Sequence, residues 1–308
     1  MTTTIPLHAA CANGMADDCN ASAPPHAGSD SAACRGAQAD FPIAEHACRV
    51  LSNASVNAEY RHLVLAVSDD AASATPGQFF HLACPPGPDG TAFLRRPMSV
   101  YGADRGTRRL EFLYKVQGMG TKGLATLRED DILDALGPLG VGFTVPEGAR
   151  HVLLLARGVG LATLGPLAAH AVSLGAKVTA VLSARSRDLL MSRDRLEAAG
   201  ARVHTVTDEE GSSDIVQLEG LLRTLHGTAP FDYMATCGSN RMLTLLQRLG
   251  TEWCVPGQTA IEQHMGCGIG SCYACVRPFR TEAGAEQLTY RRVCWDGPVF
   301  DLQETTSW

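Results

Sequence analysis

The sequence predicts a multi-domain protein of mixed α/β and β class, with an antiparallel β-barrel, a doubly wound parallel sheet and a small C-terminal domain. Three observations lead to this prediction. Short apolar strands broken by glycine and proline turns fill residues 41–147, a pattern typical of a small antiparallel barrel. Apolar runs alternate with amphipathic segments over residues 148–255, which indicates a doubly wound sheet. A group of four cysteines lies within residues 256–308.

Residues 1–40 differ from the rest of the chain. They are rich in Ala, Ser, Asp and Gly, show no hydrophobic periodicity, and lack the apolar segment behind a basic start that marks a signal peptide. We expect a disordered extension here. Its cysteines, Cys11, Cys19 and Cys34, are irregularly spaced, so we assign them no role.

The composition restricts the possible functions. With 45% apolar and 19% charged residues the 308-residue chain is globular, and no run of about 18 apolar residues predicts a transmembrane helix. The net charge of -6 comes without a basic stripe and argues against a nucleic-acid partner. Eleven cysteines in so long a chain, four of them in one motif, favour a reducing cytoplasm over a disulfide scaffold. Cys48, Cys84 and Cys254 lie among apolar neighbours, and we expect them to be buried.

Alternating apolar residues define the strands of the predicted barrel. Residues 63–67 alternate in this way, and a Pro76-Gly77 turn precedes a second strand at 78–82. A further strand at 109–116 and a glycine-proline turn at 137–140 continue the pattern.

The period changes after residue 148. Residues 151–156 form an apolar run of the kind that is buried on both faces in a parallel sheet, and a helix that ends at Gly175 follows. The unit repeats, with strands expected at 177–182, 202–207 and 231–236 and helices at 188–199, 215–225 and 241–249, the first and third closed by Gly200 and Gly250. Ligands bind at the carboxyl ends of such strands, so we expect the chemistry near 157–160, 183–187 and 237–238.

Four cysteines carry the most specific signal. Cys267, Cys272, Cys275 and Cys294 follow the pattern C-x4-C-x2-C with a distant fourth cysteine, the thiolate spacing of plant-type [2Fe–2S] sites. The intervening glycines let the backbone wrap tightly and direct amide N–H groups at sulfur. Structural zinc sites usually pair cysteines as two short knuckles, whereas Cys294 is isolated in the sequence. The motif therefore predicts a [2Fe–2S] cluster on these four metal ligands and a role in electron transfer.

Two stretches of the barrel suit a flavin nucleotide. Residues 95–101 offer arginine, which can clamp a pyrophosphate, and serine, which can donate to a flavin ring nitrogen. Residues 118–123 supply backbone N–H groups for a second phosphate contact, before a possible helix from Leu124. Each stretch alone could equally be a surface turn.

Together these motifs resemble the ferredoxin–NADP reductase superfamily. The shared features are the R-P-x-S strand at 96–99, the G-x-G-T loop at 118–121, the turn at 137–140, the nucleotide domain, and the cysteine motif with its C-W-D-G-P-V-F ending at 294–300. Within the superfamily, the chain is most similar to electron-transfer subunits of NAD-dependent, two-subunit (type B) dihydroorotate dehydrogenases. The resemblance covers about residues 41–308.

The resemblance implies cofactors, partners and site residues. The barrel would bind FAD, the sheet domain would receive NAD(H) as co-substrate, and the cluster would face a catalytic flavoprotein subunit of dihydroorotate dehydrogenase type, in a heterotetramer. It assigns the flavin and its phosphates to Arg96, Pro97, Met98, Ser99, Leu113, Tyr114, Lys115, Gly120 and Thr121. Gly158, Gly160, Cys237 and Gly238 would lie near the nicotinamide, although a buried structural cysteine is an equal alternative for Cys237. Electrons would pass between the partner's flavin and NAD through the cluster and FAD, in pyrimidine biosynthesis.

One loop departs from the family pattern. Relatives usually read G-G-x-G-x-A-P after the first strand of the nucleotide domain, whereas this chain has Arg157 at a glycine position and Thr163 in place of the proline. Either Arg157 turns outward to a phosphate or a partner, or the nicotinamide site is altered and another carrier exchanges the electrons. Arg185 and Arg187 could accept a 2′-phosphate or be solvated, which leaves NAD and NADP both open.

Other functions are consistent with the same motifs. Similar modules serve as reductase subunits of sulfite reductases, hydrogenases or other dihydropyrimidine dehydrogenases, and a partner gene would discriminate among them. A non-enzymatic, zinc-stabilised regulatory protein would be colourless, whereas flavin with a cluster is brown-yellow. No Ser/His/Asp arrangement or paired carboxylates stand out, so we assign no catalytic residue and expect substrate oxidation in the partner.

Overall fold

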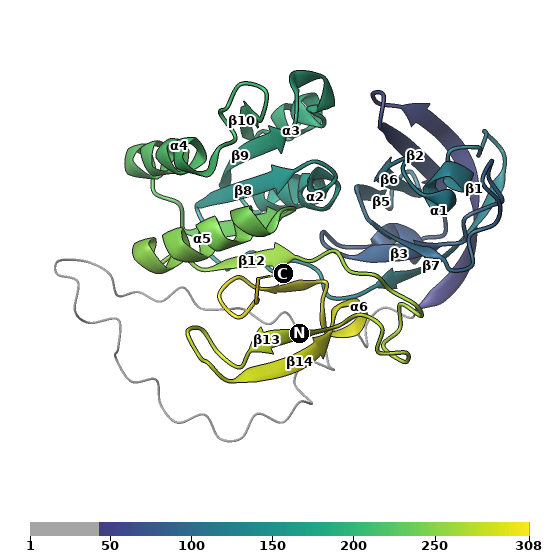
Figure 1. Ribbon diagram of the computed structural model, residues 1–308. Helices are drawn as coiled ribbons and strands as arrows, with labels where there is room; N and C mark the ends of the chain where they lie inside the picture. The colour runs from purple at the N-terminus through teal and green to yellow at the C-terminus, as the bar shows by residue number, and fades with distance from the viewer. Residues whose placement is uncertain (1–42, 308) are drawn as a thin grey trace.

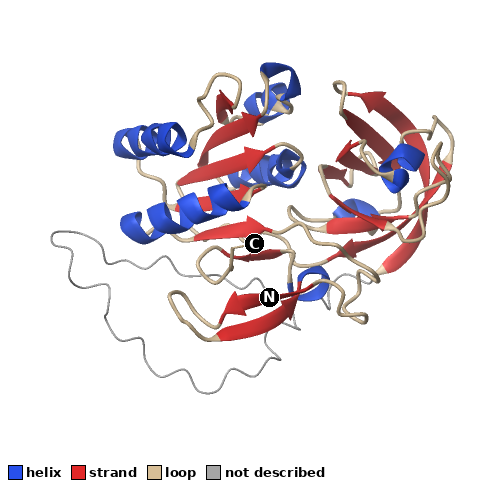
Figure 2. Cartoon of the chain, in the orientation of Figure 1, coloured by secondary structure: helices blue, strands red, loops and turns tan. Residues whose placement is uncertain are grey.

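A computed structural model describes residues 43–307, and in this part of the chain three sheets form the framework (Figure 1). The expected extension at 1–40 and its three cysteines lie outside the described residues. Figure 2 shows helices on both sides of one sheet and few helices around the other two. Among the described residues, no helix has the length and apolar character needed to cross a membrane.

The first sheet is a curled antiparallel sheet of seven strands. Its strands are β1 (Ala44–Ser55), β2 (Tyr60–Ala66), β3 (Phe79–Leu82), β4 (Arg96–Ser99), β5 (Gly102–Asp104), β6 (Arg109–Lys115) and β7 (Ile132–Leu139), in the order β4-β3-β7-β1-β2-β6-β5. Two short helices accompany it, η2 (Ala71–Ser73) and α1 (Met119–Leu124). Inward-facing residues such as Leu63, Phe80 and Phe112 are fully buried and form its core. The prediction of an antiparallel barrel is confirmed, as an open barrel.

The second sheet has six strands in the order β10-β9-β8-β11-β12-β15. Its parallel strands are β8 (His151–Arg157), β9 (Lys177–Ala184), β10 (Arg202–Thr207), β11 (Tyr233–Cys237) and β12 (Gly257–Ala260), and β15 (Val299–Asp301) is an antiparallel edge. Helices α2 (Gly160–Ser173) and α3 (Arg193–Ala198) cover one face, and α4 (Ile215–Thr228) and α5 (Asn240–Trp253) cover the other. The prediction of a doubly wound sheet is confirmed.

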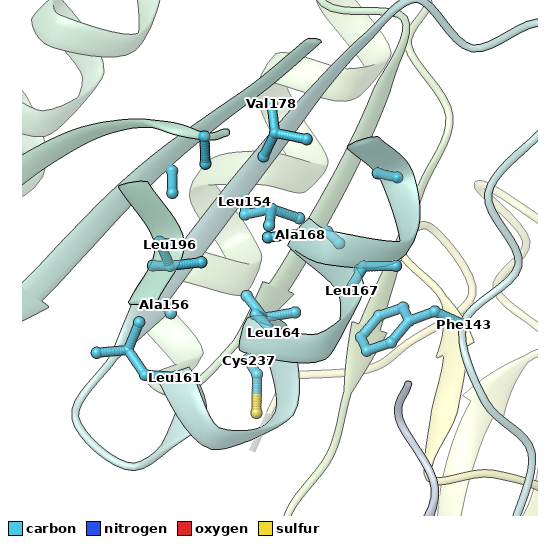
Figure 3. Packing of buried hydrophobic residues seen from close by; sticks show 14 of the residues in the cluster. Phe143, Leu154, Ala156, Leu161, Leu164, Leu167, Ala168, Val178, Leu196 and Cys237 are labelled. Carbon is cyan, nitrogen blue, oxygen red and sulfur yellow. The ribbon is translucent and has the colours of Figure 1, made fainter. Parts of the chain in front are cut away.

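Apolar side chains hold α2 and α3 on this sheet. Figure 3 shows Leu164, Leu167 and Ala168 of α2 in one cluster with Leu154 of β8, and Leu196 of α3 belongs to the same cluster. A second cluster on the other face joins β8 and β11 to α4 and α5. Because both faces are covered, the central strands β8, β9 and β11 are buried along almost their whole length rather than at alternate residues.

Three local expectations are wrong. The helix expected at 188–199 is divided into a 3-10 turn, η3 (Arg187–Leu189), and α3, because Ser192 adopts a left-handed backbone with φ 64°. Gly250 does not end α5, which continues to Trp253; a Cβ at Gly250 would lie only 3.0 Å from a Met234 atom, so the glycine permits close packing instead. Cys254 is exposed rather than buried.

The third sheet pairs β13 (Val276–Arg280) with β14 (Leu288–Arg292) and is followed by α6 (Val293–Asp296). The same segment of the chain supplies β12 before this hairpin and β15 after it, so both ends of the small domain are strands of the six-stranded sheet. A shared core joins the small domain to the barrel: Phe79, Leu139, Ile261, Met265, Cys275, Phe279, Val293, Cys294 and Phe300.

Polar contacts join the barrel to the six-stranded sheet. Glu111 of β6 accepts from Arg195 of α3 and contacts His62 at 2.9 Å. The Arg195 guanidinium lies 4.1 Å from the centre of the Tyr101 ring, whose hydroxyl is 2.8 Å from Ser192 Oγ. The His62 hydrogen bond and the Arg195 charge lower the pKa of Glu111 to about 2.

The depressed pKa makes this interface sensitive to pH. A carboxyl group whose pKa falls on folding stabilises the folded state fully above its ordinary pKa, here about 4.5, and loses that contribution as the pH falls toward 2. We expect Glu111→Gln to lower the free energy of unfolding by about 1 to 2 kcal/mol at pH 7.5, and by less at pH 4. Urea denaturation followed by circular dichroism measures both values. The control is Glu147→Gln at an exposed carboxylate, and an equal loss at both pH values would contradict the assignment.

Candidate functional site

A cavity of about 810 Å³ lies between the barrel and the six-stranded sheet, a size common for ligand and cofactor sites. The barrel and its loops contribute Phe79, Leu94, Arg95, Arg96, Pro97, Met98, Ser99, Leu113, Tyr114, Lys115, Gln117, Gly118 and Thr121. The remaining lining residues are Val159, Ala162, Ile261, Glu262, Gln263, His264, Met265 and Pro298. The cavity therefore reaches from the R-P-x-S strand to the segment that leads into the cysteine motif.

Most of the barrel residues expected to contact the flavin line this cavity. Gly120 does not, but it lies behind Arg96: a Cβ at Gly120 would be 2.9 Å from Arg96 Cγ. The side chain of Tyr114 belongs to the barrel core and donates to Asn53 Oδ1 at 2.9 Å, which leaves its main chain to face the cavity.

The glycine loop at 118–123 is helical, contrary to expectation. Helix α1 begins at Met119 and ends at Leu124, where we expected a helix to start. The Thr121 hydroxyl accepts the amide hydrogens of Gln117 and Gly118, at 3.0 and 3.1 Å, and so fixes the start of this turn. These two amides are thus already hydrogen-bonded within the loop.

The segment after β12 was missed by the sequence analysis. Residues 261–265 leave the carboxyl end of β12 and line the cavity, as expected of loops at that edge of a parallel sheet. A strand predicted at 257–260 would have placed this segment at the sheet edge. Four residues with little alternation of apolar and polar side chains are too few to predict a strand. The Glu262 carboxyl group lines the cavity, and desolvation by the protein around the cavity raises its pKa.

None of the four residues expected near a nicotinamide lines this cavity. Gly160 allows α2 to begin against β11, because a Cβ there would be 2.3 Å from the carbonyl oxygen of Cys237. Gly158 and Gly238 adopt positive φ values of 55° and 138°. Cys237 is buried beneath α2, as Figure 3 shows, and burial followed by the Glu262 charge raises the pKa of its thiol to about 12. The structure thus presents Cys237 as a buried core thiol.

Arg157 lies across the carboxyl ends of three neighbouring strands. From the end of β8 it donates to Ser183 Oγ of β9 at 2.8 Å and forms a bidentate ion pair with Asp208, which directly follows β10. Arg241 adds a contact of 3.2 Å to Asp208. Arg157, Ser213 and Arg241 together hold the pKa of Asp208 well below its ordinary value. Arg157 is therefore turned along the sheet edge where a dinucleotide is expected.

The other two arginines at this edge also have acidic partners. Arg185 pairs with Glu59 of the barrel, which also contacts Lys115 Nζ at 3.0 Å, and Arg187 pairs with Glu210. Exposed ion pairs of this kind contribute little energy, so a 2′-phosphate of NADP could displace either carboxylate. The two pairs therefore favour neither NAD nor NADP.

The four motif cysteines converge, and each sulfur accepts a backbone amide hydrogen. Cys267 Sγ accepts from Ser271 at 3.3 Å and from Cys272 at 3.4 Å, and Cys272 Sγ accepts from Cys267 at 3.4 Å. Cys294 Sγ accepts from Gly270 at 3.3 Å, and Cys275 Sγ accepts from Cys294 at 3.4 Å. Such donors stabilise the negative charge of thiolates and tune a bound metal centre.

These contacts divide the thiols into two pairs, Cys267 with Cys272 and Cys275 with Cys294. Within residues 43–307, no three His, Cys, Asp or Glu side chains are arranged to hold a single metal ion. Two thiolates for each of two irons is the arrangement of a [2Fe–2S] cluster, so the donor set fits that group. Burial opposes ionisation of Cys267, but the amides of Cys272, Ile269 and Ser271 outweigh it and lower the pKa to about 7.

Glycine makes the tight loop possible. Gly270 has φ 79°, and a Cβ there would be 3.0 Å from Cβ of Trp295 in α6. Arg292 donates to the carbonyl oxygen of Gly270 at 3.3 Å and pairs with Asp296, which ties the loop to α6. The amide that reaches Cys294 is thereby held in place.

Comparison with known proteins identifies the relatives of this chain. Residues 262–306 match the model of the iron-sulfur cluster binding domain of dihydroorotate dehydrogenase B. The electron transfer subunit of dihydroorotate dehydrogenase B (NAD(+)) from Bacillus cereus (strain 03BB102) is 33% identical over 237 residues, covering 74% of this chain and 86% of that protein. The corresponding subunit of Bacillus mycoides (strain KBAB4) is 33% identical over 236 residues, with the same coverage.

Solved structures share the fold. An NADH-dependent reduced ferredoxin-NADP oxidoreductase, studied for flavin-based electron bifurcation, superposes with a TM-score of 0.69 at 26% identity, covering 84% of this chain and 89% of that one. The ferredoxin-NADP+ reductase of Plasmodium falciparum has a TM-score of 0.53 at 12% identity, covering 67% and 89%, and shows the fold alone.

Two glycines test how strongly the cysteine loop depends on close packing. Gly270 and Gly284 have nearly equal positive φ values, 79° and 78°, but no atom lies within 4 Å of a Cβ added at Gly284. We expect Gly284→Ala to cost roughly 1 to 2 kcal/mol for the left-handed backbone alone. Gly270→Ala should cost more and also reduce the iron content, because Trp295 must move. Equal losses of stability in urea denaturation, with equal iron content, would contradict this account.

Proposed function

Because the chain belongs to the family of electron transfer subunits of NAD-dependent dihydroorotate dehydrogenase B, we propose that it carries electrons between a dihydroorotate-oxidising flavoprotein subunit and NAD. One observation carries the proposal. The four cysteines form two pairs, each sulfur accepts a hydrogen bond from a backbone amide, and the segment that leads into them lines the cavity between the barrel and the six-stranded sheet. When bound, FAD exchanges a hydride with a nicotinamide and a [2Fe–2S] cluster passes electrons singly.

The cysteine loop would hold the cluster. We assign one iron to Cys267 and Cys272 and the other to Cys275 and Cys294, following the contacts within each pair. The amide hydrogens aimed at these sulfurs would stabilise the negative charge of the reduced cluster. The burial of Cys275 and Cys294 keeps water from that side.

The barrel would hold FAD. Arg96 faces the cavity and can clamp the pyrophosphate, with Gly120 and Thr121 close to it. The Ser99 hydroxyl can donate to the flavin ring, which would rest on the apolar side chains of Pro97 and Leu113, on the main chain of Met98 and Tyr114, and near Lys115.

The carboxyl edge of the six-stranded sheet would receive the nicotinamide. Val159 and Ala162 bring the start of α2 to the cavity, and Gly158, Gly160, Cys237 and Gly238 lie at the adjoining carboxyl ends of β8 and β11. A nicotinamide can reach the flavin from these strand ends only if the Arg157–Asp208 ion pair leaves room for it there.

The partner would be a catalytic flavoprotein subunit, in a cytoplasmic heterotetramer that serves pyrimidine biosynthesis. Dihydroorotate would be oxidised in that subunit, and this chain would carry the electrons away. Tyr273 and Ile269, 64% and 41% exposed, lie in the cysteine loop and offer apolar surface to such a partner.

An anaerobic visible spectrum of the purified chain tests the function. We expect flavin and cluster bands that bleach when NADH is added. Cys272→Ser should lose the cluster bands and keep the flavin bands, while the matched control Cys254→Ser, at an exposed cysteine outside the motif, should keep both. A colourless protein after anaerobic reconstitution would refute the proposal.

Arg157 favours a second candidate, a related reductase subunit that exchanges electrons with a carrier other than nicotinamide. Its guanidinium occupies the strand ends together with Asp208 and Ser183. Bands that bleach with dithionite but not with NADH would support this candidate over the first.

Substitution of Arg157 measures how far it obstructs a nucleotide. If NADH must displace the Arg157–Asp208 pair, Arg157→Gly should lower KM for NADH by about five-fold, the equivalent of about 1 kcal/mol for such a pair. Steady-state NADH oxidation with ferricyanide measures this constant. Arg241→Gln is the control, because it removes a cation from the same Asp208 without opening the glycine loop. A rise in KM for Arg157→Gly would show instead that Arg157 binds the nucleotide.

A further inference from the structure

His81 lies between the barrel and the cysteine loop. In β3, Phe80 and Leu82 point into the barrel core, so Phe79 and His81 point out of the barrel, where Phe79 joins the core of the cysteine domain. The His81 side chain is only 1% exposed. Its Nε2 has no hydrogen-bond partner among the described residues.

The edge of the ring that bears Nε2 packs against the cysteine loop. A Cβ added at Gly268 would lie 3.0 Å from both Cε1 and Nε2 of His81, so this ring edge contacts the main chain directly. Gly268 follows Cys267 and has φ 74°, a conformation suited to glycine. Only a residue without a side chain lets the imidazole come this close to the loop.

The other side of His81 is the cavity wall. His81 is paired in register with Pro97, and Phe79 with Ser99, across β3 and β4. Phe79, Pro97 and Ser99 line the cavity that we assign to FAD. His81 therefore stands in the layer that separates the cavity from the cysteine loop.

A buried nitrogen without a partner needs an explanation, because an unsatisfied buried polar atom destabilises the folded state. Burial and the nearby Arg95 charge lower the pKa of His81 to about 4, so the imidazole is neutral at physiological pH and carries one N–H donor. The thiolates and sulfides of an iron–sulfur cluster carry negative charge and accept hydrogen bonds, so they would satisfy this donor.

We propose that His81 donates a hydrogen bond from Nε2–H to a sulfur of the iron–sulfur cluster and thereby raises the reduction potential of that cluster. The inference rests on the proposed function only in requiring that the cluster is bound. It adds a side-chain donor from the barrel to the amide donors of the loop itself.

The test is an EPR-monitored redox titration of the full-length chain with its cofactors. We expect His81→Leu, which keeps an apolar filling but loses the donor, to shift the cluster midpoint potential to more negative values. His81→Gln places an amide N–H near the position of Nε2 and should restore most of the wild-type potential. The FAD content and the visible cluster bands report whether each variant is assembled.

A second measurement needs no stable Leu variant. In wild-type protein labelled with ¹⁵N-histidine, pulsed EPR of the reduced cluster should detect a coupled ¹⁵N nucleus, and this coupling should vanish in labelled His81→Gln. His264→Gln is the matched control, because His264 lies three residues before Cys267 and is exposed to the cavity. The coupling should persist in that variant.

The outcomes separate the inference from the proposed function. A protein without cluster bands refutes both. A cluster whose potential is the same in His81→Leu and wild type, or one that shifts equally in the Leu and Gln variants, refutes the donor role while leaving the proposed function intact. An absent ¹⁵N coupling in the wild type also refutes the donor role.

Discussion

The geometry of the cysteine loop depends on one constraint: backbone amides must point at sulfur. Turning the chain inward within so few residues requires left-handed backbone at Gly268, Gly270 and Tyr273. Two of these positions are glycines pressed against a neighbouring side chain, His81 in one case and Trp295 in the other. The conformation of the loop therefore depends on the elements around it as well as on its own sequence. The thiols keep their positions only if those elements keep theirs.

The fold supplies that rigidity by interleaving its parts. The segment that carries the cysteines starts from β12 and returns to β15, both in the six-stranded sheet, and its core is shared with Phe79 and Leu139 of the barrel. Ion pairs add to these connections, because Arg195 and Arg185 of the sheet domain pair with Glu111 and Glu59 of the barrel. The barrel and the six-stranded sheet are therefore joined in two ways, through the segment that carries the cysteines and through these ion pairs.

Regular patterns could be predicted from the sequence. Alternation gave the barrel strands, continuous apolar runs gave the parallel strands, and the spacing of the cysteines indicated their convergence, because each of these signals is local. Their residue ranges agree closely with β6, β8 and β10.

Features that depend on tertiary contacts could not be predicted in this way. Gly250 reads as a helix stop, but its role is to admit Met234 and Val255 from outside the helix. The pairing of Arg157 with Asp208 joins residues 51 positions apart through the sheet. Strands β12 and β15, on either side of the segment that carries the cysteines, have 4 and 3 residues, too few to show an alternation of apolar and polar side chains. His81 showed no signal at all, since a histidine in a strand is unremarkable until its neighbours are known.

The four thiols are unequally exposed to solvent, so the two ends of the cysteine site differ. Cys275 and Cys294 are buried in the core shared with the barrel, whereas Cys272 is exposed and is followed by the exposed Tyr273. A redox centre held by these residues has an inner end toward the cavity and an outer end toward solvent. A cluster held here would place one iron in the apolar interior and the other beside solvent, where an electron-transfer partner would reach it.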